Sequence, residues 1–104
     1  MSDITQLHRA LIARVLEGNG KAPIGLRRAA FDNSGLDEPM RTLIQKVAYH
    51  ASSVTDEDVA AVRDAGLSED QAFEIVVCAA VGQAGRQYEN ALAALASARR
   101  QGAG

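Results

Sequence analysis

The sequence predicts an all-α domain of about five helices. Three observations support this fold class: apolar residues recur at helical spacing, two segments have the sequence of a capping box, and no segment shows convincing strand alternation. The 104 residues suit one domain. We therefore assign residues 1–104 to a single helical unit and expect a frayed tail at 100–104.

The first two helices are separated by a glycine-containing break. From about Asp3 to Leu16, apolar residues recur at spacings of 3 and 4 and form one stripe. The members of this stripe are Ile4, Leu7, Leu11 and Val15. Ser2 or Asp3 can cap the start of this helix, and residues 18–20 end it. The second helix is expected between Pro23 and Asn33, because proline suits a first helical turn and an asparagine with a nearby glycine suits an end.

The third and fourth helices are expected from similar signals. The third runs from about Pro39 to His50, with Asp37 as its cap. Its predicted buried face consists of Met40, Leu43, Ile44, Val47 and Ala48. The fourth begins at Thr55, which has the spacing of a capping box with Asp58. Gly66 suits a left-handed end for this helix.

The fifth helix is the longest predicted element and runs from Glu69 to about Arg99. Ser68 and Gln71 supply its capping box. One continuous apolar stripe follows the helix: Phe73, Val77, Ala80, Ala84, Tyr88, Ala91 and Leu95. Small residues beside it allow another helix to approach closely: Ala79, Gly82 and Gly85. Because a small monomer leaves much apolar surface exposed, we expect self-association. If the approaching helix belongs to another subunit, Arg86 lies at or near that interface.

Composition excludes several classes of protein. The net charge is −2 with interspersed signs, so there is no basic surface for nucleic acid or for an anionic membrane. No apolar run has the length of a membrane span. A single cysteine rules out an intramolecular disulfide, and the start "MSDITQLHRA" is unlike a signal peptide. We therefore expect a soluble cytoplasmic protein. The two histidines are distant in sequence and there is no Cys-x-x-Cys, so we expect neither a metal site nor a cofactor.

The run "VTDEDVAAVRDAGLSEDQAFEIVVCAAVGQAGRQYENALAAL", preceded by "EPMRTLIQKVAYHA", resembles the carboxymuconolactone decarboxylase and alkylhydroperoxidase D-like family. The resemblance covers about residues 36–95. It implies an all-helical fold that assembles into trimers or hexamers. It also places the redox thiols of the alkylhydroperoxidase branch at Ala51 and Val54, and the accompanying histidine at Asp58. Those three active groups are absent, so the peroxidase chemistry does not carry over.

Four residues are candidates for chemistry: His50, Tyr49, Glu74 and Arg86. His50 and Tyr49 close the third helix, where a histidine can act as general acid or base, or can simply favour the helix dipole. Glu74 and Arg86 lie in an otherwise apolar helix, where they can line a polar cavity, form an inter-subunit ion pair or face solvent. Cys78 is expected to be a buried core residue.

Three functions remain open from the sequence. The first is a non-redox binding or assembly module that forms homo-oligomers and engages a protein partner or a small-molecule ligand. The second is a cofactor-independent enzyme of lyase or decarboxylase type, which would use His50 and Arg86 on a small carbonyl or acid substrate. The third is an antioxidant peroxidase that depends on Cys78 alone. The missing thiol pair disfavours the third, and the scarcity of convergent polar residues favours the first over the second.

Overall fold

The computed structural model of the chain describes residues 2–18 and 20–102. Within these residues the chain forms five α-helices and one 3-10 turn, with no strand, which confirms the predicted all-α class. The elements in chain order are α1 (Ser2–Glu17), α2 (Ile24–Asp32), α3 (Met40–Tyr49), η1 (Ala51–Ser53), α4 (Asp56–Asp64) and α5 (Glu69–Gly102). None of these described helices combines the length and apolar character that crossing a membrane would require.

The helix ends agree with the sequence prediction to within three residues. The largest difference is in α5, which continues past Arg99 to Gly102. Residues 100–102 of the expected frayed tail are therefore helical, whereas 103–104 lie outside the described residues. The expected cap of α1 at Ser2 or Asp3 also falls on side chains outside the description.

Both predicted capping boxes are present. In α4, the Asp58 backbone N–H donates to Thr55 Oγ1 at 3.2 Å, and the Thr55 N–H donates to Asp58 Oδ2 at 2.9 Å. In α5, the corresponding bonds between Ser68 and Gln71 measure 3.1 and 2.9 Å. Gly66 has φ 113°, in the region that favours glycine, and it ends α4 as expected. These reciprocal bonds satisfy backbone donors that have no partner inside the helix.

The connection from α2 to α3 differs in one detail from the prediction. Asn33 ends α2 in a left-handed conformation at φ 51°, and its N–H bonds back to the last turn. At the start of α3, however, the side chain of Glu38 rather than Asp37 binds the first turn. Its carboxylate accepts from the Thr42 N–H at 3.0 Å and from the Thr42 hydroxyl at 2.6 Å. These hydrogen bonds lower the pKa of Glu38 below its ordinary value.

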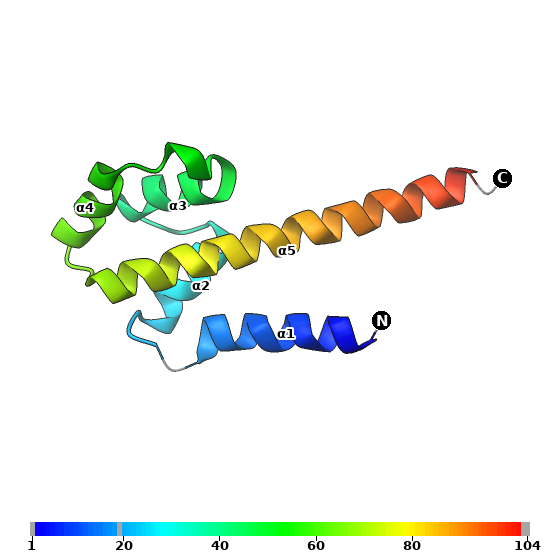
Figure 1. Cartoon of the computed structure of the whole chain (residues 1–104), viewed down its shortest axis with the longest axis horizontal. Coiled ribbons are helices and arrows are strands. Elements are labelled where there is room, and N and C mark those ends of the chain that lie inside the picture. Colours follow the sequence, from blue (N-terminus) through cyan, green and yellow to red (C-terminus); the bar gives the residue numbers. More distant parts are fainter. Residues whose placement is uncertain (1, 19, 103–104) are drawn as a thin grey trace.

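The helices are arranged around the first half of α5. Figure 1 shows α5 crossing in front of α2, with α1 on one side and α3 and α4 on the other. The molecule is elongated, 57 × 28 × 21 Å, because the last turns of α5 extend beyond the other helices. α1 runs antiparallel to α5 and lies below the middle of α5 in Figure 1.

The core lies between α2, α3 and one face of α5. The largest fully buried side chains are Leu43, Ile44, Ile75, Val62 and Cys78. The predicted buried face of α3 is confirmed: Leu43, Ile44 and Ala48 are buried, and Met40 and Val47 pack against them. On α5 the buried residues are mostly small: Ala72, Ile75, Cys78, Ala79, Gly82 and Gly85. Small residues let α2 approach the long helix closely.

Candidate functional site

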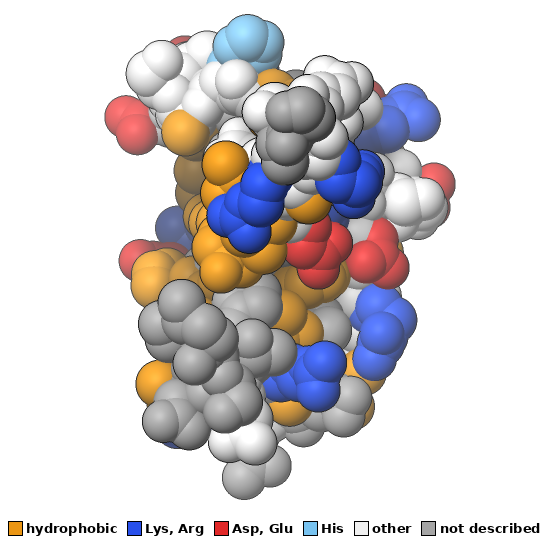
Figure 2. All heavy atoms as spheres, turned by 90° about the vertical axis from the view of Figure 1, so that its right-hand side faces the viewer, with side chains coloured by type: hydrophobic (Ala, Val, Ile, Leu, Met, Phe, Trp, Pro, Cys, Tyr) orange, Lys and Arg blue, Asp and Glu red, His pale blue; other side chains and the backbone are white. Residues whose placement is uncertain are grey.

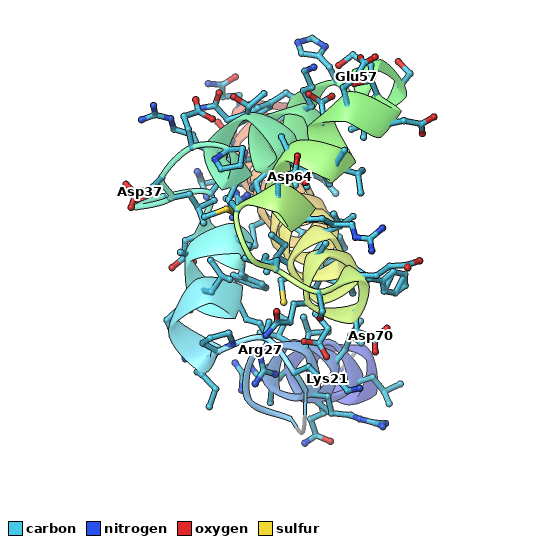
Figure 3. All side chains as sticks on the ribbon, turned by 90° about the vertical axis from the view of Figure 1, so that its left-hand side faces the viewer. Lys21, Arg27, Asp37, Glu57, Asp64 and Asp70 are labelled. Atoms are coloured by element: carbon cyan, nitrogen blue, oxygen red, sulfur yellow. The ribbon has the colours of Figure 1, made fainter. Side chains whose placement is uncertain are left out.

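The loop between α1 and α2 is held by two charged side chains of opposite sign. Arg27, only 5% exposed, donates from Nε to the Ala22 carbonyl at 3.0 Å and from Nη1 to the Gly18 carbonyl at 2.8 Å. The Glu74 carboxylate accepts from the N–H groups of Lys21 and Ala22 at 2.8 and 2.6 Å. Figure 3 views this end of the molecule, with Lys21 and Arg27 labelled where the loop meets α5. Glu74 therefore fixes the entry to α2.

A cavity of about 220 Å³ lies beside this loop. The residues that matter for its chemistry are Arg14, Val15, Arg27, Glu74, Val77 and Cys78. The Cys78 thiol is 1% exposed and lies 3.5 Å from the Val15 carbonyl oxygen. Burial raises its pKa above the ordinary value; the Glu74 charge adds to this effect and Arg27 opposes it. A buried thiol with a raised pKa is a weak nucleophile at neutral pH, so this cavity does not present an activated cysteine.

Arg86 binds the end of α2 within the same chain. Its Nη1 donates to the Phe31 carbonyl at 2.7 Å, and its Nη2 donates to Gln83 Oε1 at 3.0 Å. A cation at the last turn of a helix complements the partial negative charge there. One turn earlier, Gly82 lies directly against the Phe31 backbone, and a Cβ at Gly82 would come within 2.8 Å of the Phe31 carbonyl carbon. The helix that approaches Gly82 is thus α2 of the same chain, so the condition under which Gly82 and Arg86 would mark a subunit interface is not met.

Tyr49 and His50 lie at the far end of α3. Both residues are exposed, and together with Thr42, Gln45 and Lys46 they line an open cavity of about 330 Å³. The His50 N–H donates to the Lys46 carbonyl at 2.7 Å. This cavity shares no residue with the one beside Glu74. Within one chain, therefore, the four candidate residues lie in three separate places: Glu74 at the α1–α2 loop, Arg86 at the end of α2, and Tyr49 with His50 at the end of α3.

The three positions that the family resemblance assigns to redox groups are Ala51, Val54 and Asp58, and each has a different role in this structure. Ala51 begins the 3-10 turn after α3, and Val54 is half-buried against the core. Asp58 forms an ion pair with Lys46, with Nζ 2.9 Å from Oδ2. The hydrogen bond from Lys46, followed by those from Thr55, lowers the pKa of Asp58 below its ordinary value. This carboxylate joins α3 to the start of α4.

The predicted apolar stripe of α5 lies on the face opposite the core. Phe73, Tyr88 and Leu95 are 64%, 53% and 55% exposed. The alanines of the stripe are also exposed, and Val77 is half-buried. In Figure 2, which looks along the molecule from the free end of α5, hydrophobic side chains gather between that end and α1. α5 thus has two apolar faces, one that forms the core and one whose residues are exposed or, at Val77, half-buried.

Comparison of the chain with family models, curated proteins and solved structures finds no match. Among the described residues, no group of three or more histidine, cysteine or acidic side chains is placed to hold a metal ion. The sequence did not single out Arg27, Glu38 or Lys46. Arg27 contacts the α1–α2 loop and Lys46 contacts Asp58 of α4, and periodicity carries no signal for such contacts. The contact of Glu38 with Thr42 is local, four residues along the chain.

Proposed function

We propose that this chain is a helical assembly module that works as a homo-oligomer and carries no thiol redox chemistry. The observation that carries the proposal is the apolar stripe of α5 on the face opposite the core, which is exposed at every position except the half-buried Val77. Monomeric soluble proteins rarely expose a long contiguous apolar surface, and such a surface commonly marks an interaction site. Leu7 and Leu11 of the neighbouring α1 are exposed as well.

The absence of redox chemistry is supported by the state of the single cysteine. Cys78 is buried in the core and its pKa is raised, so little thiolate forms at neutral pH. Ala51 and Val54 occupy the positions where the resemblance places a thiol pair. On this proposal the chain is a relative of the carboxymuconolactone decarboxylase and alkylhydroperoxidase D-like family that has kept a helical scaffold without its thiols. A free, unpaired thiol suits the reducing cytoplasm.

The separation of the candidate residues supports assembly over catalysis. Glu74 accepts from backbone groups of the α1–α2 loop, and Arg86 donates to the end of α2, so both charges are engaged in holding the fold. His50 and Tyr49 lie at a different end of the domain. A cofactor-independent enzyme needs its acid, base and charge-stabilising groups around one substrate.

The proposal is tested by measuring the mass of the purified protein in solution. Light scattering after size-exclusion chromatography at micromolar concentration is expected to give a multiple of the 11.0 kDa chain mass. Replacing Tyr88 and Leu95 with glutamate should shift the mass toward the monomer, because a charge buried in an apolar contact is strongly unfavourable. Asn90→Glu, an exposed change on another face of the same helix, is the matched control and should leave the mass unchanged. A monodisperse 11.0 kDa species in the wild type would refute the proposal.

A further inference from the structure

The exposed stripe of α5 is symmetrical in its spacing. Its members follow one another at intervals of 4, 3, 4, 4, 3 and 4 residues, a series that reads the same in both directions about Ala84. The three members before Ala84 therefore match the three after it: Phe73, Val77 and Ala80 against Leu95, Ala91 and Tyr88. An isologous contact requires this kind of self-complementary surface. We propose that α5 pairs with α5 of a second copy, antiparallel, about a two-fold axis at Ala84; this inference rests on the proposed function.

Side-chain sizes fit the antiparallel arrangement. With Ala84 facing the partner's Ala84, Tyr88 lies opposite the partner's Ala80, and Val77 lies opposite the partner's Ala91. In these two pairs a larger side chain meets a smaller one, as interdigitated packing requires, and at the ends of the stripe Phe73 lies opposite the partner's Leu95. A parallel pair in the same register would instead set Tyr88 against the partner's Tyr88. The alanine at the centre permits the two helices to approach closely.

The charges at the two ends of α5 also favour the antiparallel orientation. Glu69 and Asp70 lie in the first turn, and Arg99 and Arg100 lie in the last. All four side chains are exposed, and Asp70 is visible in Figure 3 at the start of the helix, beside Lys21. Antiparallel pairing about Ala84 brings Glu69 opposite the partner's Arg99, whereas parallel pairing brings like charges together. Charge complementarity of this kind selects orientation as well as partner.

The area of the contact indicates that α1 takes part. From Phe73 to Leu95 the stripe is about 33 Å long, and a helix is about 10 Å wide, so α5 alone presents a strip well below the ~800 Å² that a stable dimer uses on each partner. A two-fold axis that places the two stripes face to face keeps α1 and the partner's α1 on the same side. Leu7, 70% exposed, and Leu11 then extend the contact. The resulting interface is a layer of four helices, two from each copy.

A two-fold contact restricts the number of subunits. It gives a dimer, or a larger assembly made of such pairs, such as a hexamer of three pairs. It does not give an isolated trimer. Of the two assemblies that the family resemblance implies, only the hexamer accommodates this pairing.

Single-cysteine cross-linking tests the orientation and register. In a Cys78→Ala background, Ala84→Cys places a thiol on the proposed axis, facing its own copy. Disulfides join residues whose Cα atoms are about 4.4–6.8 Å apart, which facing positions of closely packed helices satisfy. Ala91→Cys is the control, because the partner's Ala91 would lie about 21 Å away along the helix, at the 1.5 Å rise per residue. Helical circular dichroism checks that each variant folds.

Oxidation of the Ala84→Cys protein is expected to give mostly covalent dimer, and oxidation of the Ala91→Cys protein alone little. A mixture of Val77→Cys and Ala91→Cys chains, refolded together, should again give the covalent dimer, and it provides the test if Ala84→Cys does not fold. Equal cross-linking of Ala84→Cys and Ala91→Cys chains would show a parallel pair and overturn the inference. Light scattering could show an oligomer while neither the Ala84→Cys protein nor the mixture forms a covalent dimer. That result would overturn the inference and leave the proposed function intact. A monomer would overturn both.

Discussion

Gly82 offers the sharpest test of how α5 packs, because its substitution has two opposing effects. In an isolated helix, Gly→Ala stabilises by about 1 kcal/mol, since alanine loses less backbone freedom on folding. In this protein a Cβ at position 82 would overlap the Phe31 carbonyl group of α2. The neighbour is backbone, so it cannot rotate away, and α2 must move as a unit.

The structure gives the size of the net effect. Overpacking of a well-packed contact costs about 1–3 kcal/mol, and a contact with backbone belongs at the upper end of that range. Moving α2 also weakens the bond from Arg86 Nη1 to the Phe31 carbonyl at 2.7 Å, and a bond of this charged type contributes about 1.5–3 kcal/mol. After subtraction of the helix-propensity gain, Gly82→Ala should lower the free energy of unfolding by about 2–4 kcal/mol.

Urea unfolding followed by circular dichroism measures this loss. With a slope of about 2 kcal/mol per molar urea, the midpoint should fall by about 1–2 M. Variants must be compared at the same protein concentration, because assembly makes apparent stability depend on concentration. Gly25→Ala is the matched control: it lies in α2 with nothing within 4 Å of the added carbon, so it should be neutral or stabilising. A Gly82→Ala midpoint at or above that of the wild type would refute the close approach of α2 to α5.

Three further predictions concern the polar contacts and the thiol. Glu74→Ala should lower the free energy of unfolding by about 1–3 kcal/mol, because it leaves backbone donors of the α1–α2 loop without their acceptor, whereas Glu74→Gln keeps an acceptor and should lose less in the same urea assay. Native Cys78 should react slowly with a thiol reagent at neutral pH and quickly in denaturant, and the protein should not turn over hydroperoxide with a dithiol reductant; turnover that disappears in Cys78→Ser would contradict this. The pKa of Asp58 is lower in the folded chain than its ordinary 3.8, so its ion pair with Lys46 stabilises the fold above that pH and the effect is lost as pH falls through the folded-state pKa. In Asp58→Asn this acid-dependent loss should be smaller, and acid titrations of unfolding that coincide with those of the wild type would exclude the contribution.

The helices could be predicted because their signals are local. The caps at Thr55 and Ser68 require only residues three positions away, and the stripe on α3 is a simple periodic pattern. Tertiary structure did not override either signal. The same reasoning failed at Asp37 because two neighbouring acids compete for one helix start, and the choice of Glu38 depends on how the chain enters α3.

The role of each face of α5 could not be predicted from periodicity. The largest apolar side chains, such as Phe73 and Leu95, mark the exposed face, whereas the core face contains Gly82, Gly85 and other small residues that contribute little to a hydrophobic pattern. A close helix contact is made possible by missing side-chain volume, which a search for large apolar residues overlooks. Glu74 was identified as unusual in an apolar helix, but its acceptor role depends on Lys21 and Ala22, more than fifty residues earlier.

The extension of α5 beyond the other helices has a consequence for how order is distributed along the chain. The last buried residue of α5 is Gly85, and Arg86 bonds the end of α2, whereas most of residues 87–102, a segment of about 16 residues, are exposed. A water-exposed helix of this length is only marginally stable even when it is rich in alanine. The outer turns of α5 are therefore expected to fray in a dilute monomer and to become rigid when a second surface covers them. The helical content of the protein then depends on protein concentration, because the second half of α5 becomes ordered when copies of the chain associate.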